Sequence, residues 1–139
     1  MKGKTGIVVV GHGSTHAAAN KQLIRFVADL RRRLGSDSIE AAFMAHASPT
    51  IAEAVGRLVA AGCTHVYGLS LFLTAGGHLG RDIPAQFRRA LRRHPAVSWE
   101  LSPPLLEQPL LAELVASCLK PFLDSQKAQR TTNRRPAKA

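Results

Sequence analysis

The sequence predicts an α/β fold, a three-layer αβα sandwich around a four-stranded parallel sheet, in one domain. Short apolar runs alternate four times with segments in which apolar residues recur every three or four positions. Such runs are typical of strands covered on both faces, and alternating strands and helices give a parallel sheet with right-handed crossovers. The chain has 139 residues, 45% of them hydrophobic, which is enough for one buried core.

Four strands are expected, and their patterns suggest where each lies in the sheet. The first and third contain apolar runs without alternation, as in Ile7-Val8-Val9-Val10, whereas the fourth alternates apolar and polar residues and is typical of an edge. We expect the order 2-1-3-4, which puts the fourth strand at an edge and the first beside the third. The predicted strands cover residues 6–10, 39–44, 65–73 and 97–101.

The first two helices are defined by spacing and by their end residues. Leu23 and Val27 belong to an apolar stripe at helical spacing over residues 17–34, and Gly35 is a natural C-cap. The second helix is expected to begin with Ser48 as N-cap and Pro49 at its first position, and to stop at Gly62.

The last two helices carry prolines. Asp82 and Pro84 predict that the third begins near residue 83, and it is expected to end near residue 93. The fourth starts near Pro109, and Pro121 is expected to end or kink it. We expect the fourth helix to bury Leu110, Leu114, Val115, Cys118 and Leu119.

The formal net charge is +10, from nineteen Lys and Arg against nine Asp and Glu, and five of the nineteen fall in the last fifteen residues. We therefore expect a folded domain over residues 1–124 and a basic, disordered tail over 125–139. Aromatic residues make up 5% of the chain and are not interleaved with the basic ones, so no base-stacking platform is predicted and nucleic-acid binding is not favoured.

The sequence contains no apolar run near 18 residues, so no transmembrane span is expected. The first apolar run is too short for the core of a signal peptide. Cys63 and Cys118 are expected to be buried free thiols. Together these features predict a cytoplasmic protein.

Two glycine-flanked histidines follow predicted strands directly. His12 stands in Gly11-His12-Gly13-Ser14 after the first strand, and His78 follows Gly76-Gly77 after the third. In the order 2-1-3-4 these loops face each other across one crevice, where ligands bind in open α/β sheets. Either histidine alone is typical of a hydrogen-bonded loop residue, but the equivalent positions favour an open site for a divalent transition ion.

Three segments together resemble the sirohydrochlorin chelatase family, and in particular its short CbiX-type cobaltochelatases, which are class II chelatases. They are V-V-V-G-H-G-S, S-P-T-I and L-F-L-T-A-G-G-H-L-G-R-D-I-P, within residues 6–119. The resemblance implies a chelatase-like fold and a lyase that inserts a divalent metal into the tetrapyrrole sirohydrochlorin during cobalamin or siroheme biosynthesis. The metal is then a substrate, cobalt first and iron or nickel alternatively, with no organic cofactor. A homodimer is also implied.

The resemblance assigns roles to the loop residues. It implies that His12 and His78 bind the incoming ion and act in catalysis. Arg81 suits the carboxylates of sirohydrochlorin. The residues expected to contact this substrate are Ser14, Gly76, Gly77 and Arg81.

The chain departs from the family pattern near the end of the second predicted strand. Family members usually carry a glutamate there, in a pattern like F-L-E-x-x-x-P, and this chain has Ala45 at that place. We hypothesise that His46, one residue on, partly substitutes as a metal ligand.

Three other functions remain open. A non-catalytic carrier of metal or tetrapyrrole on the same fold would be consistent with the missing acid. A histidine-phosphatase-like enzyme would need an arginine directly before the histidine, where this chain has Gly11. A nucleic-acid-binding module would bind with steep salt dependence, and its binding would survive loss of both histidines.

Overall fold

The computed structural model describes residues 3–77 and 79–134. The chain divides into two compact units, Met1–Leu105 and Leu106–Ala139, each of which is treated by itself. His78, one of the two predicted metal ligands, lies outside the described residues.

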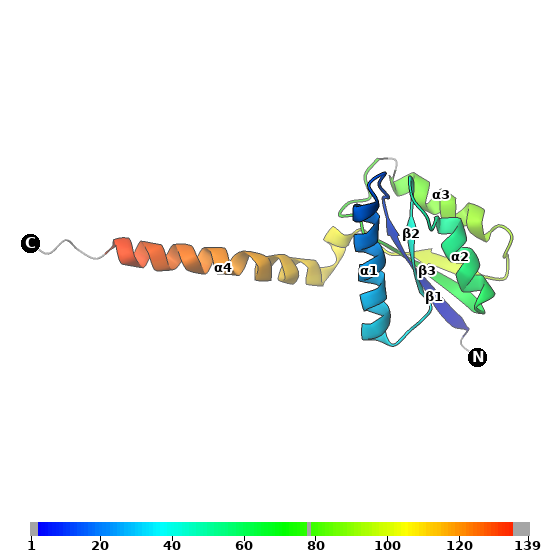
Figure 1. Cartoon of the computed structure of the whole chain (residues 1–139), viewed down its shortest axis with the longest axis horizontal. Helices are drawn as coiled ribbons and strands as arrows, with labels where there is room; N and C mark the ends of the chain where they lie inside the picture. Colours follow the sequence, from blue (N-terminus) through cyan, green and yellow to red (C-terminus); the bar gives the residue numbers. More distant parts are fainter. Residues whose placement is uncertain (1–2, 78, 135–139) are drawn as a thin grey trace, which may run out of the picture. The chain divides into compact units, whose positions relative to one another are not determined.

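The first unit is built on a four-stranded parallel sheet (Figure 1). The strand order β2-β1-β3-β4 confirms the predicted fold and topology. Val10 of β1 is paired with Ala42 of β2 and with Ser70 of β3, so the carboxyl ends of these three strands lie side by side. The strands are β1 (Lys4–Gly11), β2 (Ile39–Phe43), β3 (Cys63–Ser70) and β4 (Ser98–Leu101).

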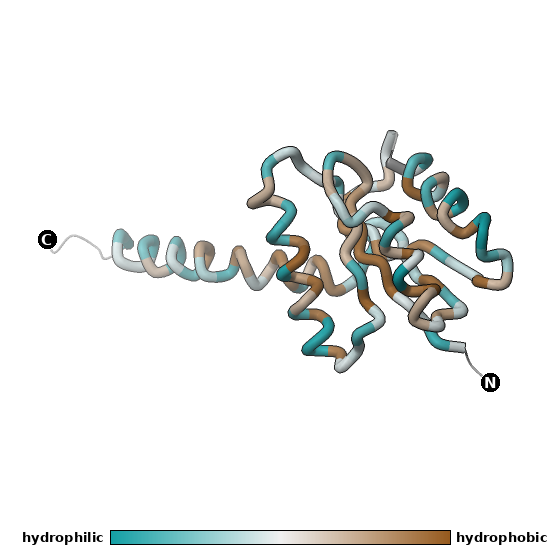
Figure 2. Tube along the Cα trace, turned by 45° about the vertical axis from the view of Figure 1, so that its right-hand side comes forward, coloured by the Kyte–Doolittle hydropathy of each residue, from teal (hydrophilic) through white to brown (hydrophobic). Residues whose placement is uncertain are grey.

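Helices cover both faces of the sheet in this unit. They are α1 (Ala17–Leu34), α2 (Ile51–Ala60) and α3 (Leu79–Leu91). Val8 and Val10 of β1 belong to the apolar cluster that includes residues of α2 and α3, whereas Val9 belongs to the cluster that includes Val27 of α1. Consecutive residues of β1 thus point to opposite faces, both covered, which explains its continuous apolar run. Figure 2 shows hydrophobic segments, coloured brown, gathered in the interior of this unit.

The second helix begins later than predicted. Its N-cap is Thr50, whose hydroxyl accepts a hydrogen bond from the Glu53 amide at 3.1 Å, and Ser48 is not the cap. The Phe43 amide donates to the Pro49 carbonyl oxygen at 2.8 Å, so the chain before Thr50 runs beside β2 and the helix can start only after it.

The third helix begins earlier than predicted, at Leu79, and Pro84 lies inside it. The prediction that Asp82 and Pro84 mark its start is therefore wrong. Because proline lacks an amide hydrogen, Pro84 cannot bond to the carbonyl of Gly80, but the remaining turns still form. The third strand is also displaced, since β3 ends at Ser70 and residues 71–73 continue as loop.

The second unit contains α4 (Pro109–Asn133), preceded by the 3₁₀ turn η1 (Leu105–Glu107). The helix continues past Pro121, so that residue does not end it. Residues 125–133, expected to be disordered, are helical, because Gln, Lys, Ala and Arg favour helix here. The division of the chain at residue 124 stays a prediction.

The predicted burial of the apolar face of α4 is wrong. Leu110 is 71% exposed, and Cys118, expected to be buried, is also exposed, whereas Cys63 is buried as predicted. Among the described residues of its own unit, the short η1 is the one other element beside α4, so little there can cover it. The other exposed apolar residues of this face are Leu114, Val115, Leu119, Phe122 and Leu123. None of the helices in the described part of the chain combines the length and apolar character that a membrane span requires.

Candidate functional site

The loops that follow β1, β2 and β3 leave the sheet at one edge and are tied together through their backbones. The Met44 amide donates to the Gly11 carbonyl oxygen at 2.9 Å, and the Ala45 amide donates to the His12 carbonyl oxygen at 2.9 Å. On the other side, the Leu71 amide donates to the Val10 carbonyl oxygen at 3.0 Å. These bonds extend the parallel ladders beyond the strands, so the first residues of the three loops hold fixed positions relative to one another.

Gly13 allows the first two loops to approach. Its φ of 92° lies in the left-handed region, and a Cβ at this position would collide with the carbonyl oxygen of Ala45. Only glycine satisfies both demands. The second glycine of the G-H-G-S segment is thus required by the contact between two loops that are far apart in the sequence.

One nitrogen of the His12 ring lies at hydrogen-bond distance from a carbonyl, and the other has no hydrogen-bond partner among the described residues. Its Nδ1 lies 3.0 Å from the carbonyl oxygen of Gly13. Because a carbonyl can only accept, this contact favours the tautomer with the proton on Nδ1, which leaves the Nε2 lone pair free. The His12 side chain is exposed, so an ion from solvent can reach it.

His46 and Phe72 lie beside the His12 ring. The His12 and His46 ring centroids are 6.3 Å apart with an interplanar angle of 25°, and the Phe72 ring stands edge-on to His12 at 6.4 Å. His46 comes from the loop after β2 and Phe72 from the loop after β3. The structure therefore brings two histidines together, from neighbouring loops, at the carboxyl edge of the sheet.

The loop that carries His12 is also clamped to α1. The Asn20 side-chain oxygen accepts from the Ser14 amide at 2.9 Å, and its nitrogen donates to the Ser14 carbonyl oxygen at 2.7 Å. The Ser14 hydroxyl accepts from the amide of His16, the N-cap residue of α1, at 3.0 Å. Asn20 is not among the site residues predicted from the sequence. An asparagine in the first turns of a helix was the available signal, because asparagine competes for local backbone groups.

Three further predicted site residues, Gly76, Gly77 and Arg81, lie within the described part of the chain. Gly76 and Gly77 are exposed, and Gly77 has a φ of 66° that favours glycine. Arg81 is exposed in the first turn of α3. The expectation that these residues and Ser14 contact a substrate, and that His78 binds the ion, stays a prediction.

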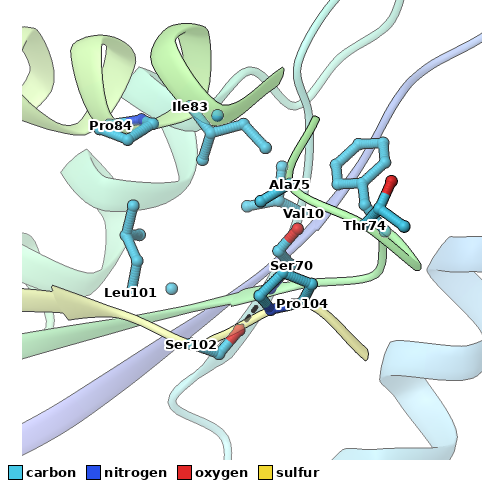
Figure 3. Close-up of a pocket in the computed structure, with 12 residues that line it drawn as sticks. Val10, Ser70, Thr74, Ala75, Ile83, Pro84, Leu101, Ser102 and Pro104 are labelled. Atoms are coloured by element: carbon cyan, nitrogen blue, oxygen red, sulfur yellow. Dashed lines mark hydrogen bonds between the residues drawn. The ribbon is translucent and has the colours of Figure 1, made fainter. Parts of the chain in front are cut away.

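Two hollows open at this edge of the sheet. A cavity of about 180 Å³ lies between the ends of β3 and β4 and the start of α3 (Figure 3). It is lined by Val10, Ile83 and Leu101, among others, and the Ser70 amide donates to Ser102 Oγ at 3.0 Å in its wall. This volume is below the roughly 300–1,000 Å³ of typical ligand pockets, so the cavity cannot enclose a macrocycle.

The second hollow, of about 460 Å³, runs beside His12 along α1. Its wall combines polar groups of the clamped loop with the apolar side chains of Leu23 and Phe26. Among the described residues that line either hollow there is no carboxylate. No group of three or more His, Cys, Asp or Glu side chains that could hold a metal occurs in residues 3–77 and 79–134, so the described part of the site offers a histidine pair and not a closed cage.

A family model, CbiX, matches residues 6–121. The chain belongs to the CbiX family. This confirms the resemblance found in the sequence, and the match covers the three helices of the first unit and all of its sheet except the first two residues of β1.

Curated proteins similar to this CbiX chain are named as sirohydrochlorin chelatases. It is 36% identical over 85 residues to the sirohydrochlorin cobaltochelatase of Methanosarcina barkeri, a match that covers 60% of this chain and 65% of that protein. It is 32% identical over 110 residues to the chloroplastic sirohydrochlorin ferrochelatase of Arabidopsis thaliana, covering 79% of this chain and 49% of that protein. The chain thus spans less than two thirds of the length of these relatives.

Solved structures share the fold. One is a CbiX protein from Marinobacter aquaeolei VT8, whose description assigns it to cobalamin (vitamin B12) biosynthesis. It superposes with a TM-score of 0.75 at 26% identity, over 87% of this chain and 98% of that one. The sirohydrochlorin chelatase SirB from Bacillus subtilis subspecies spizizenii in complex with cobalt superposes with a TM-score of 0.68 at 29% identity, over 73% of this chain and 43% of that one.

Proposed function

We propose that this CbiX chain is a lyase that inserts a divalent metal ion into sirohydrochlorin during cobalamin or siroheme biosynthesis. The observation that carries the proposal is the free Nε2 of His12, exposed at the carboxyl edge of the sheet in a family whose relatives are named sirohydrochlorin cobaltochelatase and ferrochelatase. Cobalt is the preferred ion of the proposal, and iron or nickel is the alternative, since imidazole suits each of them.

The proposed reaction exchanges ligands on the ion and releases two protons. His12 and His78 hold the ion while its waters leave, and the four ring nitrogens of sirohydrochlorin then replace the imidazoles. Two of these nitrogens carry protons that must depart as the metal enters. An imidazole that has released the ion has a free nitrogen lone pair and accepts one of them, and solvent water accepts the other.

The macrocycle is proposed to lie across the open edge above the loops. Arg81 pairs with its carboxylates, and the exposed backbone at Gly76 and Gly77 lets it approach closely. Ser14 contributes at the rim of the hollow beside His12. The 180 Å³ cavity is too small for the ring system and serves at most one of its substituents.

We propose further that the chain acts as a homodimer in the cytoplasm. Its match to cobalt-bound SirB covers 43% of that chain, which supports a second copy supplying the missing half. The free thiols of Cys63 and Cys118 support a reducing compartment. Light scattering coupled to size-exclusion chromatography tests the dimer, and a monomer at micromolar concentration would contradict it.

One sequence observation favours a second function. Ala45 stands where the family usually has an acid, so the chain could carry metal or tetrapyrrole without inserting one into the other. The test mixes the anaerobic protein with sirohydrochlorin and cobalt(II) and follows the absorbance of the product. Acceleration over the uncatalysed rate that is lost in a His12→Ala, His78→Ala double variant supports the chelatase, and tight binding without acceleration supports the carrier. Repeating the assay with iron(II) and nickel(II) ranks the metals.

A further inference from the structure

We infer that His46 and His12 form a two-imidazole ligand pair, and that this pair makes the site select for ions that prefer nitrogen over oxygen ligands. The inference deepens the proposed function and rests on it for the identity of the ion as a substrate. It concerns His46, which stands beside the position where the family usually has an acid.

The backbone fixes the two histidines relative to each other. The Ala45 amide donates to the carbonyl oxygen of His12, and Met44 makes the same kind of bond to Gly11. The absence of a side chain at Gly13 lets the two loops touch. His46 directly follows Ala45, which is hydrogen-bonded to the backbone of His12. The backbone therefore places the His46 ring beside the His12 ring.

The ring separation is close to that of a chelating pair. Two imidazoles bound to one tetrahedral ion hold their ring centres roughly 5 Å apart, since each metal–nitrogen bond is about 2.0–2.1 Å. The His12 and His46 centroids are 6.3 Å apart. Both side chains are exposed, so rotation about their side-chain torsions can close the remaining gap of about 1 Å without disturbing the core.

The backbone of His46 is held in an unusual conformation. Its φ is 64°, in the left-handed region, and it is the one non-glycine residue with a positive φ in residues 3–77 and 79–134. Glycine would adopt this conformation without strain. Strained residues of this kind cluster at ligand sites, which supports a role for the imidazole itself.

The described residues that line the hollow beside His12 include no Asp or Glu, and Ala45 contributes only a methyl group. Carboxylates suit magnesium and manganese, whereas imidazoles suit nickel, cobalt, iron and zinc. A histidine beside Ala45 thus shifts the ligand set toward the later transition ions.

The test measures metal binding without tetrapyrrole, so its outcome is independent of catalysis. The full chain carrying His78→Ala isolates the pair, and nickel(II) affinity is measured by calorimetry in that background. The added substitution is His46→Asn, because asparagine tolerates a positive φ and lacks the imidazole. The control is His94→Asn, at a residue that follows α3 and lies at the opposite edge of the sheet.

We expect His46→Asn to weaken nickel(II) binding by at least about tenfold, and His94→Asn to leave it unchanged. Pulsed electron paramagnetic resonance of bound copper(II) should count two imidazoles in the His78→Ala chain and one after His46→Asn. Replacing Ala45 by Glu together with His46→Asn should lower the ratio of nickel(II) affinity to manganese(II) affinity. Unchanged nickel affinity in His46→Asn, or a single imidazole before that substitution, overturns the inference.

Discussion

The amide of Ala45 donates a hydrogen bond to the carbonyl oxygen of His12 at 2.9 Å, and this bond connects the loops that follow β2 and β1. It explains how two segments separated by more than thirty residues present neighbouring imidazoles. The residue whose amide makes this bond carries only a methyl group, in place of the acid of the family pattern. The histidine next to it places its ring centroid 6.3 Å from that of His12.

Replacing Gly13 by Ala should destabilise the fold and disrupt the site. The new Cβ would strike the Ala45 carbonyl and would also occupy a φ of 92°. We expect a loss of about 1–3 kcal/mol in the free energy of unfolding, together with weaker cobalt(II) binding. Urea denaturation and a cobalt titration check the two effects.

Gly56→Ala is the matched control for that change. Gly56 lies inside α2 and a Cβ there would meet no atom within 4 Å, so alanine should raise stability by about 0.5–1 kcal/mol. If Gly13→Ala proves as harmless as Gly56→Ala, the close contact between the two loops is not present in solution.

Asn20→Ala should loosen the loop that carries His12. It removes one acceptor and one donor that hold the backbone of Ser14 to α1. Net losses of about 0.5–1.5 kcal/mol per hydrogen bond predict a decrease of about 1–3 kcal/mol in the free energy of unfolding. Asn20→Asp keeps the acceptor for the Ser14 amide and loses the donor, so it should fall between the parent and Asn20→Ala. Equal stability of all three chains would exclude the clamp.

Two single substitutions distinguish the observed start of α2 from the one predicted by sequence. Thr50→Ala removes the hydroxyl that accepts from the Glu53 amide and should cost about 1 kcal/mol. Ser48→Ala should change the thermal midpoint little, because Ser48 is not the N-cap. If Ser48→Ala lowered the thermal midpoint more than Thr50→Ala did, Ser48 would be the N-cap of α2, as the sequence predicts.

The pKa of Asp29 should lie below its ordinary value of 3.8. The cause is first the hydrogen bond from Arg33, four residues on along α1, and then the nearby charges of Arg33 and Arg32. A carboxyl whose pKa is lowered by folding contributes stability above its unfolded pKa and loses it as the pH falls through the folded value. Carbon-detected NMR titration between pH 2 and about 6 checks this, and Arg33→Gln should move the pKa back upward.

The parts of the fold that local patterns determine were predicted well. The four strands, their order and the C-cap at Gly35 follow from apolar periodicity and from glycine, and each is confirmed. The start of α2 was missed because the choice between Ser48 and Thr50 depends on a bond between Phe43 and Pro49, a tertiary contact. The stripe on α4 identifies an apolar face, but it does not say what covers that face.

The candidate site was predicted in part. The position of His12 follows from its place after an apolar strand, and the structure confirms that it stands at the carboxyl edge. The collision that excludes a side chain at Gly13 involves Ala45, a residue distant in sequence, so no local pattern indicates it. The clamp by Asn20 spans six residues, and its one local signal is an asparagine in the first turns of the helix. The catalytic role of His12 and His78 stays a prediction.

The most direct test of the central claim is a single-turnover measurement of cobalt(II) insertion into sirohydrochlorin under anaerobic conditions. The parent chain, His12→Ala and the His94→Ala control are compared at equal concentration, with circular dichroism to verify folding. We predict that His12→Ala lowers the insertion rate by about 100-fold or more, while His94→Ala keeps the rate of the parent. A folded His12→Ala chain that inserts cobalt as fast as the parent would contradict the claim that the loop after β1 holds the incoming ion.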